Sequence, residues 1–144
     1  MNVASGFFAS ATFAPRWANM ENDVQKVLGF GGFFFRSADQ KSLAKWYSDN
    51  LGIIPVPTDA DSLPWMADGG PTVFAPFAAD TDYFAADKSF MLNFRVADIE
   101  AMIGQLQQAG IEVKRLDDMP GIGKFAQLSD PEGNAIELWE PETS

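Results

Sequence analysis

Two short stretches of the chain, FRSAD at residues 35–39 and FRVAD at residues 94–98, differ at one position and decide how the fold is interpreted. Each follows an apolar, strand-like run, residues 31–34 in the first case and residues 90–93 in the second. Each ends in an aspartate, a preferred helix N-cap, and is followed by apolar residues at helical spacing. A glycine follows each helical stretch, in the position that often closes a helix. The sequence therefore predicts a strand followed by a capped helix, repeated within one chain.

Further strand-like runs extend this repeat into two modules. They lie after the two predicted helices, at residues 53–57, 71–78, 83–86, 111–116, 124–129 and 135–139. The last two runs are joined by DPEGN at residues 130–134, where proline presets one turn dihedral and glycine supplies a left-handed residue. We therefore predict an α+β fold of two tandem βαβββ modules, residues 24–87 and 88–141.

The size and composition fit one globular domain. The chain has 144 residues, of which 47% are hydrophobic and 13% aromatic, enough to bury a core without disulfide or metal support. We place the domain at residues 24–141 and treat residues 1–23 as an N-terminal extension. No apolar run approaches the 18 residues of a membrane span, and no basic residue precedes the first apolar stretch. A cytoplasmic protein is expected.

The absence of two residue types excludes several kinds of chemistry. Without Cys, the chain has no disulfide, thiolate zinc site or cysteine nucleophile. Without His, it has no Ser-His-Asp triad and lacks the commonest metal ligand. The net charge of −10 disfavours nucleic acid and anionic membrane surfaces as partners.

The motifs at residues 35–47 and 93–99, and above all DPEGNAIELWEP at residues 130–141, resemble the vicinal oxygen chelate superfamily, the glyoxalase, bleomycin-resistance and dioxygenase group. The likeness extends over residues 27–141. It implies that each module curls into a half-barrel and that two half-barrels enclose an open cavity, often in a homodimer. We therefore expect a homodimer with a small-molecule ligand as its partner.

The resemblance also locates the positions that hold a metal in this superfamily. They fall on Gly32, Met91 and Glu137. Of these side chains, Glu137 alone is a ligand for a hard divalent cation, and one carboxylate does not make a metal site. We therefore expect neither a divalent metal nor another cofactor.

Strand alternation predicts which side chains face the cavity, because every second residue of a strand points to the same side. The predicted lining consists of Phe34, Met91, Asn93, Gln127, Glu137 and Trp139. A mostly apolar hollow with a few polar groups is typical of a small-molecule site. Three roles remain open for Glu137: an inert buried residue, an anchor for a ligand's donor, or a catalytic general base.

Three functions follow from this lining. The first is binding of a small, partly apolar organic molecule without a catalytic metal. The second is a lyase or isomerase that uses Glu137 as general base. The third is a metal-dependent enzyme of the glyoxalase or dioxygenase type. It ranks last, because Lewis-acid catalysis needs several ligands and Gly32 and Met91 stand at two of their positions.

Overall fold

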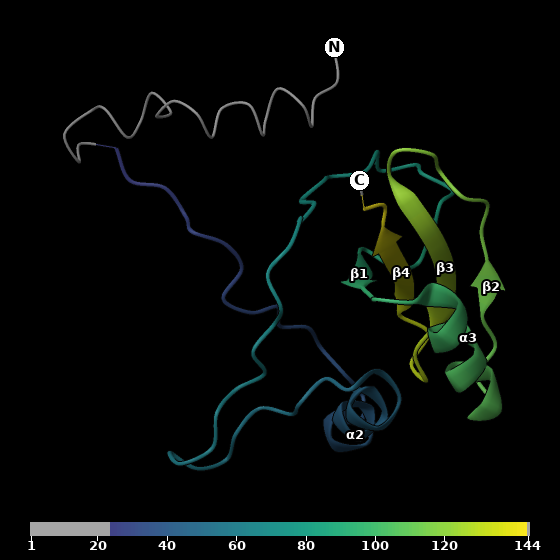
Figure 1. Cartoon of the computed structure of the whole chain (residues 1–144). Helices are drawn as coiled ribbons and strands as arrows, with labels where there is room; N and C mark the ends of the chain where they lie inside the picture. Colours follow the sequence, from purple (N-terminus) through teal and green to yellow (C-terminus); the bar gives the residue numbers. More distant parts are fainter. Residues whose placement is uncertain (1–23, 144) are drawn as a thin grey trace. The chain divides into compact units, whose positions relative to one another are not determined.

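A computed structural model describes residues 24–143 of the chain (Figure 1). These residues form two units, 24–35 and 36–143. The predicted N-terminal extension, residues 1–23, lies outside the described residues. The larger unit contains these elements: α2 Gln40–Leu51, β1 Met91–Arg95, α3 Ile99–Gln108, β2 Lys114–Arg115, β3 Gly123–Ser129 and β4 Ala135–Pro141. Two helices and a mixed sheet in the described part confirm the α+β class.

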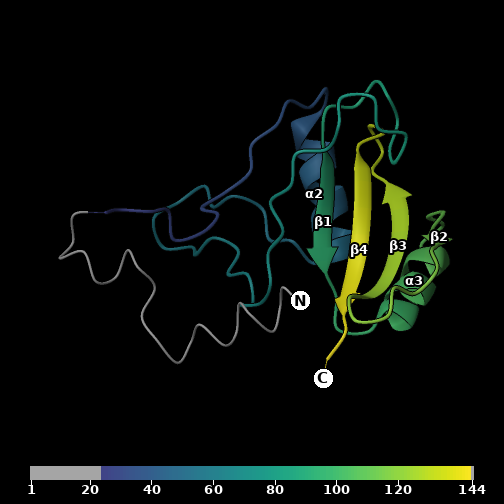
Figure 2. The same cartoon turned by 90° about the horizontal axis from the view of Figure 1, so that it is seen from above.

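The four strands form one sheet in the order β1-β4-β3-β2. β4 lies between β1, to which it is parallel, and β3, to which it is antiparallel (Figure 2). Phe94, Leu138 and Ala126 lie opposite one another across these three strands. The last two are fully buried, because α3 packs on β3 and β4 and the Tyr47 ring of α2 contacts Phe94. This apolar face and the two helices form the core.

Both predicted helices are present, with the predicted N-caps. The Asp39 carboxylate accepts a hydrogen bond from the Ser42 amide at 3.1 Å, and the Asp98 carboxylate accepts one from the Ala101 amide at 3.0 Å. These bonds satisfy first-turn amides that have no partner within the helix. α2 ends at Gly52. In the described part of the chain, no helix is long and apolar enough to span a bilayer.

The predicted hairpin between β3 and β4 is confirmed. Gly133 has a φ of 80°, a left-handed conformation that glycine adopts without a Cβ clash. Inside the turn, the buried Asp130 carboxylate accepts hydrogen bonds from the Glu132 amide at 2.8 Å and the Asn134 amide at 3.0 Å. It also accepts bonds from the Asn134 side chain and the Tyr47 hydroxyl, both at 2.7 Å. The turn therefore attaches α2 to the sheet.

The predicted strands of the first module are not formed in the described residues. No strand is present at residues 31–34, 53–57, 71–78 or 83–86, so these predictions were wrong. Five of the nine prolines lie between positions 55 and 76, and proline cannot donate a hydrogen bond to a strand ladder. The predicted strand at 111–116 is reduced to β2, two residues long.

Candidate functional site

A row of polar side chains crosses the sheet on the face opposite the helices. Asn93 of β1 lies opposite Glu137 of β4, which lies opposite Gln127 of β3. Lys114 of the edge strand β2 continues the row beside Gln127. Neighbouring strands are about 4.7–4.9 Å apart, so each of these residues is next to the following one. The row brings together three of the residues predicted to line the cavity.

Glu137 is the buried centre of this row, with 6% of its surface exposed. One carboxylate oxygen, Oε1, accepts a hydrogen bond from Asn93 Nδ2 at 2.8 Å. The other, Oε2, accepts a hydrogen bond from the hydroxyl of Tyr83, which lies in the connection before β1. A carboxylate withdrawn from water needs such donors to replace its hydration. The two bonds therefore hold the Glu137 side chain in one orientation.

The bond to Glu137 also changes the acidity of Tyr83. Burial, the hydrogen bond to Glu137 and the negative charge of that carboxylate together raise the pKa of Tyr83 to about 12. The Gln127 side chain opposes this shift to a lesser degree. Tyr83 is consequently a neutral hydrogen-bond donor at physiological pH.

Apolar side chains border the polar row. On one side Trp139 and Phe125 stack with their ring centroids 6.1 Å apart and their planes inclined by 2°. The Trp139 indole nitrogen donates to the Ile122 carbonyl at 3.0 Å. A Cβ atom at Gly123 would lie 2.8 Å from that nitrogen, so the close approach of β3 to Trp139 requires glycine. Met91, on the other side of the row, lies two residues before Asn93 on the same face of β1.

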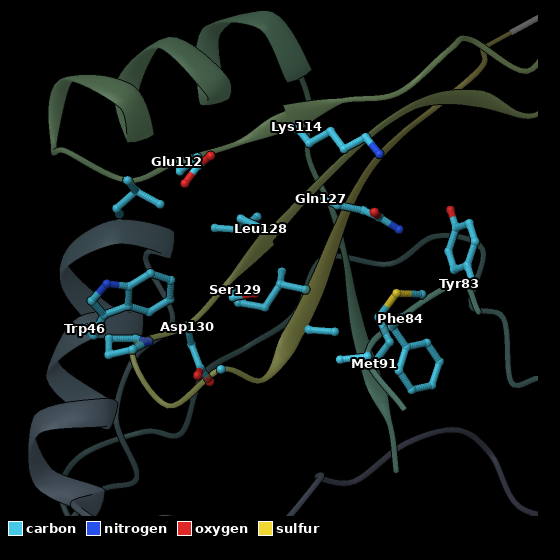
Figure 3. A pocket seen from close by; sticks show the side chains of 16 residues that line it. Trp46, Tyr83, Phe84, Met91, Glu112, Lys114, Gln127, Leu128, Ser129 and Asp130 are labelled. Atoms are coloured by element: carbon cyan, nitrogen blue, oxygen red, sulfur yellow. The ribbon is translucent and has the colours of Figure 1, made fainter. Parts of the chain in front are cut away.

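A cavity of about 580 Å³ lies beside the row, toward β2 and the hairpin turn (Figure 3). Its lining includes Met91, Gln127, Tyr83 and Lys114. In Figure 3 the side chains of Lys114, Gln127 and Tyr83 reach toward the same side of the sheet. Glu137 itself does not line the cavity, and Tyr83 stands at the boundary between the two.

The fold brings most of the predicted site residues together, but not all of them. Asn93, Gln127 and Glu137 are adjacent, and Met91 and Trp139 lie on the same face. Phe34 belongs to the other unit, residues 24–35, where its side chain is exposed. Tyr83 was missed at the sequence level. It lies 54 positions before Glu137 in the chain, and no local pattern indicates that the two side chains meet.

The residues at the superfamily's metal positions do not fit a divalent cation. Glu137 supplies the one carboxylate among these three positions. Met91 offers a thioether, a soft and weak donor, and Gly32 has no side chain. Among the residues that the structure describes, no three His, Cys, Asp or Glu side chains are grouped so that they could hold a metal.

A family model described as the glyoxalase-like domain matches residues 32–139. The chain belongs to this family. Solved structures similar to this glyoxalase-like chain include TnmS3, an antibiotic binding protein from Streptomyces sp. CB03234 (28% identity over 73% of this chain and 88% of that one, TM-score 0.46). A putative glyoxalase family protein from Bacillus anthracis is 23% identical over 71% of this chain and 84% of its own (TM-score 0.45).

The bleomycin resistance determinant encoded on the transposon Tn5 is 21% identical over 74% of this chain and 92% of its own, with a TM-score of 0.46. No curated protein matches the chain.

Proposed function

We propose that this chain binds a small, partly apolar organic molecule on the sheet face that carries Glu137, without a catalytic metal. The observation that carries the proposal is the buried carboxylate of Glu137 within a row of polar side chains, bordered by aromatic and thioether groups. Such a surface offers apolar contact for the body of a ligand and a few fixed polar groups for its orientation.

Each part of this face has a definite role in the proposal. The Trp139 ring, stacked on the buried Phe125 ring, offers a flat apolar surface against which a planar ligand can pack. Glu137 accepts hydrogen bonds, whereas the side-chain amides of Asn93 and Gln127 both donate and accept them. The groups on this face therefore match a molecule that carries at least one hydrogen-bond donor.

NMR of the protein's own signals, recorded with a library of small aromatic and aliphatic molecules, tests this function. We expect hits that compete with one another and shift the indole signal of Trp139. Glu137→Gln keeps the size of the side chain and removes its charge, so it should change the affinity of hits by at least about tenfold. The matched control is Asp49→Asn, which removes one negative charge from the exposed surface of α2. Hits that bind both variants like the wild type would contradict the proposal.

A second function, that of a lyase or isomerase with Glu137 as general base, is favoured by the contact between Glu137 and Tyr83. This contact pairs a proton acceptor with a proton donor. In such a reaction the carboxylate would remove a proton from a carbon beside a carbonyl, and the phenol would donate a proton to the carbonyl oxygen. Deuterium exchange into carbonyl-containing hits tests this step. Exchange by the wild type, lost in a Glu137→Gln variant that still binds, would identify an enzyme. Binding without exchange would leave the binding function alone.

We also propose that the protein acts as a homodimer. Large apolar side chains are exposed between residues 54 and 77 of the larger unit, among them Val56, Val73 and Phe74. Contiguous exposed apolar surface is typical of an interface, and a second copy of the chain packed on this segment would cover these side chains. Sedimentation equilibrium should give twice the chain mass of 15.7 kDa, and a single-chain mass at micromolar concentration would refute the dimer.

A further inference from the structure

The two donors that hold Glu137 differ in how firmly they are attached. Asn93 belongs to β1 and is fixed by the sheet. Tyr83 belongs to residues 79–90, which form turns and bends without a helix or strand, and 41% of its surface is exposed. Tyr83 can therefore move away from the carboxylate together with its backbone, whereas the backbone of Asn93 is held beside Glu137 by the strand ladder.

When Tyr83 leaves, Glu137 Oε2 loses its donor, and an entering ligand must replace both that hydrogen bond and the cover that the phenol gives to a carboxylate now 6% exposed. A neutral hydroxyl would restore the hydrogen bond alone. A protonated amine would restore the hydrogen bond and also neutralise the charge, which makes it the stronger partner. A ligand carboxylate would be repelled. The position vacated by the phenol therefore selects an ammonium group.

The other charged groups near this face do not reverse that preference. Lys114 lies beyond Gln127 in the row, so Gln127 separates its strand position from that of Glu137. Glu112, which also lines the adjacent cavity, carries the opposite charge to Lys114. Arg95 lies on the same face, but its guanidinium donates to the Asp68 carbonyl at 3.0 Å and is thereby directed toward that loop. Glu137 remains the charge at the centre of the row, in a chain with a net charge of −10.

Aromatic rings accompany the phenol and supply apolar contact for the body of the ligand. The Phe77 ring contacts the rings of Tyr83 and Phe84, with centroids 5.8 Å and 5.9 Å apart. Tyr83 and Phe84 line the 580 Å³ cavity, where their side chains are visible in Figure 3. A ligand that takes the place of the Tyr83 hydroxyl would therefore lie beside the Phe77 and Phe84 rings, over the sheet face. Aromatic faces also attract cations.

We propose that Tyr83 occupies the place of a ligand's hydrogen-bond donor on Glu137, and that the ligand is a primary or secondary amine, bound in its protonated form and carried on an aromatic or apolar body. This inference rests on the proposed binding function and names the ligand class of the same site. Tyr83 is then a gate: it satisfies Glu137 in the empty protein and leaves when the amine enters.

Three probes with the same apolar body test the ligand class: 2-phenylethylamine, 2-phenylethanol and 3-phenylpropionate, titrated by NMR at pH 7. The amine should bind at least about tenfold more tightly than the alcohol, and the carboxylate should bind least. Glu137→Gln should abolish the preference for the amine. Equal affinity for amine and alcohol, or a preference that survives Glu137→Gln, would overturn the inference.

Tyr83→Phe tests the gate, because it keeps the ring and removes the competing hydroxyl. The amine should bind Tyr83→Phe severalfold more tightly than the wild type. Tyr47→Phe is the matched control, since it removes the other tyrosine hydroxyl, which is bonded to Asp130 in the core, and it should leave amine binding unchanged. Weaker amine binding by Tyr83→Phe would show that the phenol is a ligand contact and would overturn the gate.

These outcomes separate the inference from the function on which it rests. If the alcohol binds this face as well as the amine does, the amine preference fails and small-molecule binding stands. If neither the probes nor any library compound shifts the Trp139 signal, the binding function itself fails. Near-UV circular dichroism of each variant verifies that its tertiary structure is retained.

Discussion

The two halves of the chain carry the same cap-and-helix motif, but the residues around the two helices differ. α2 and α3 both begin after an aspartate that caps the first turn. After α3, the strands β3 and β4 are joined by a turn of five residues and lie beside β1. After α2, residues 52–90 contain five prolines and no strand. A capped helix therefore forms from local interactions, whereas a sheet also needs a short turn and a full set of amide donors.

The second half also stabilises the helix of the first. The Glu132 carboxylate, in the β3–β4 turn, accepts hydrogen bonds from the Ser37 hydroxyl at 2.8 Å and the Ala38 amide at 2.9 Å, just before α2. The Glu140 carboxylate, in β4, accepts a bond from the Ile99 amide at 2.8 Å at the start of α3. Each helix thus has a carboxylate from this hairpin at its positive end, in addition to its own cap.

Hydrogen exchange should show the largest difference between the halves. Amides of β3 and β4 lie in a buried sheet and open only on global unfolding, whereas residues 53–78 have no strand ladder. We expect protection in the strands to exceed that of residues 53–78 by about 10³-fold or more. Mass spectrometry of peptic fragments measures this protection of the amides from exchange. Equal protection would show that residues 53–78 pair with strands in solution, and a dependence on protein concentration would assign that pairing to a second copy.

Asp130→Ala should cause the largest loss of stability of any single substitution considered. The buried carboxylate, 4% exposed, accepts bonds from the turn amides and from Tyr47, and its removal leaves those donors unsatisfied. We expect the free energy of unfolding to fall by about 3–5 kcal/mol, measured by urea denaturation. The exposed control Asp49→Asn should cost far less. A loss below about 1 kcal/mol in Asp130→Ala would mean that the turn does not organise α2.

The same substitution, Leu to Ala, can be made once in each half of the chain to compare their contributions to stability. Leu138 of β4 is fully buried at 0% exposure, whereas Leu63 is 75% exposed. Leu138→Ala should cost about 2–5 kcal/mol in unfolding free energy. Leu63→Ala should change it by less than about 0.5 kcal/mol. A large cost for Leu63→Ala at high protein concentration alone would place this residue in a dimer interface.

The contact of Tyr83 with Glu137 can be followed by its effect on tyrosine ionisation. The chain has two tyrosines, and burial and the bond to Asp130 also raise the pKa of Tyr47 above its ordinary value. Absorbance titration should place Tyr83 near 12 in the wild type and closer to its ordinary value of 10 in Glu137→Gln. Because the folded-state pKa is raised, the contact stabilises the fold below pH 10 and its contribution is lost as the pH rises toward 12. An unchanged titration in Glu137→Gln would contradict the contact.

Removing the contact between Glu132 and the start of α2 should give the smallest change in stability, and the size of this change should depend on pH. Hydrogen bonds from the Ala38 amide, the Ser37 hydroxyl and the Asp39 amide lower the pKa of Glu132, against a weaker opposing effect of the Asp39 charge. A lowered folded-state pKa means that the stabilisation is complete above the unfolded-state pKa of about 4.5 and is lost as the pH falls below it.

Glu132→Gln should therefore be less stable than the wild type at pH 7, and the difference should shrink on acidification toward pH 3. Urea denaturation at each pH measures the difference. A gap that stays constant with pH would show that the Glu132 charge does not contribute.

The sequence by itself determined both helices with their caps, the hairpin, and the common face of Asn93, Gln127 and Glu137. These features depend on helical spacing, strand alternation and turn residues, which act over a few neighbouring positions. The same patterns at residues 53–57 and 71–78 predicted strands that are absent, because alternation favours a strand but provides neither a partner nor the amides that proline lacks.

Only the tertiary structure decided which side chains complete the candidate site and join the two halves. The Tyr83 hydroxyl reaches Glu137 across 54 positions, and the Glu132 carboxylate reaches the Ala38 amide across 94. Contacts at such separation follow from the packing of α2 and of the connection before β1 against the sheet. Packing between distant segments leaves no repeating pattern in a single sequence. Tyr83 could therefore be identified as a site residue only from the fold.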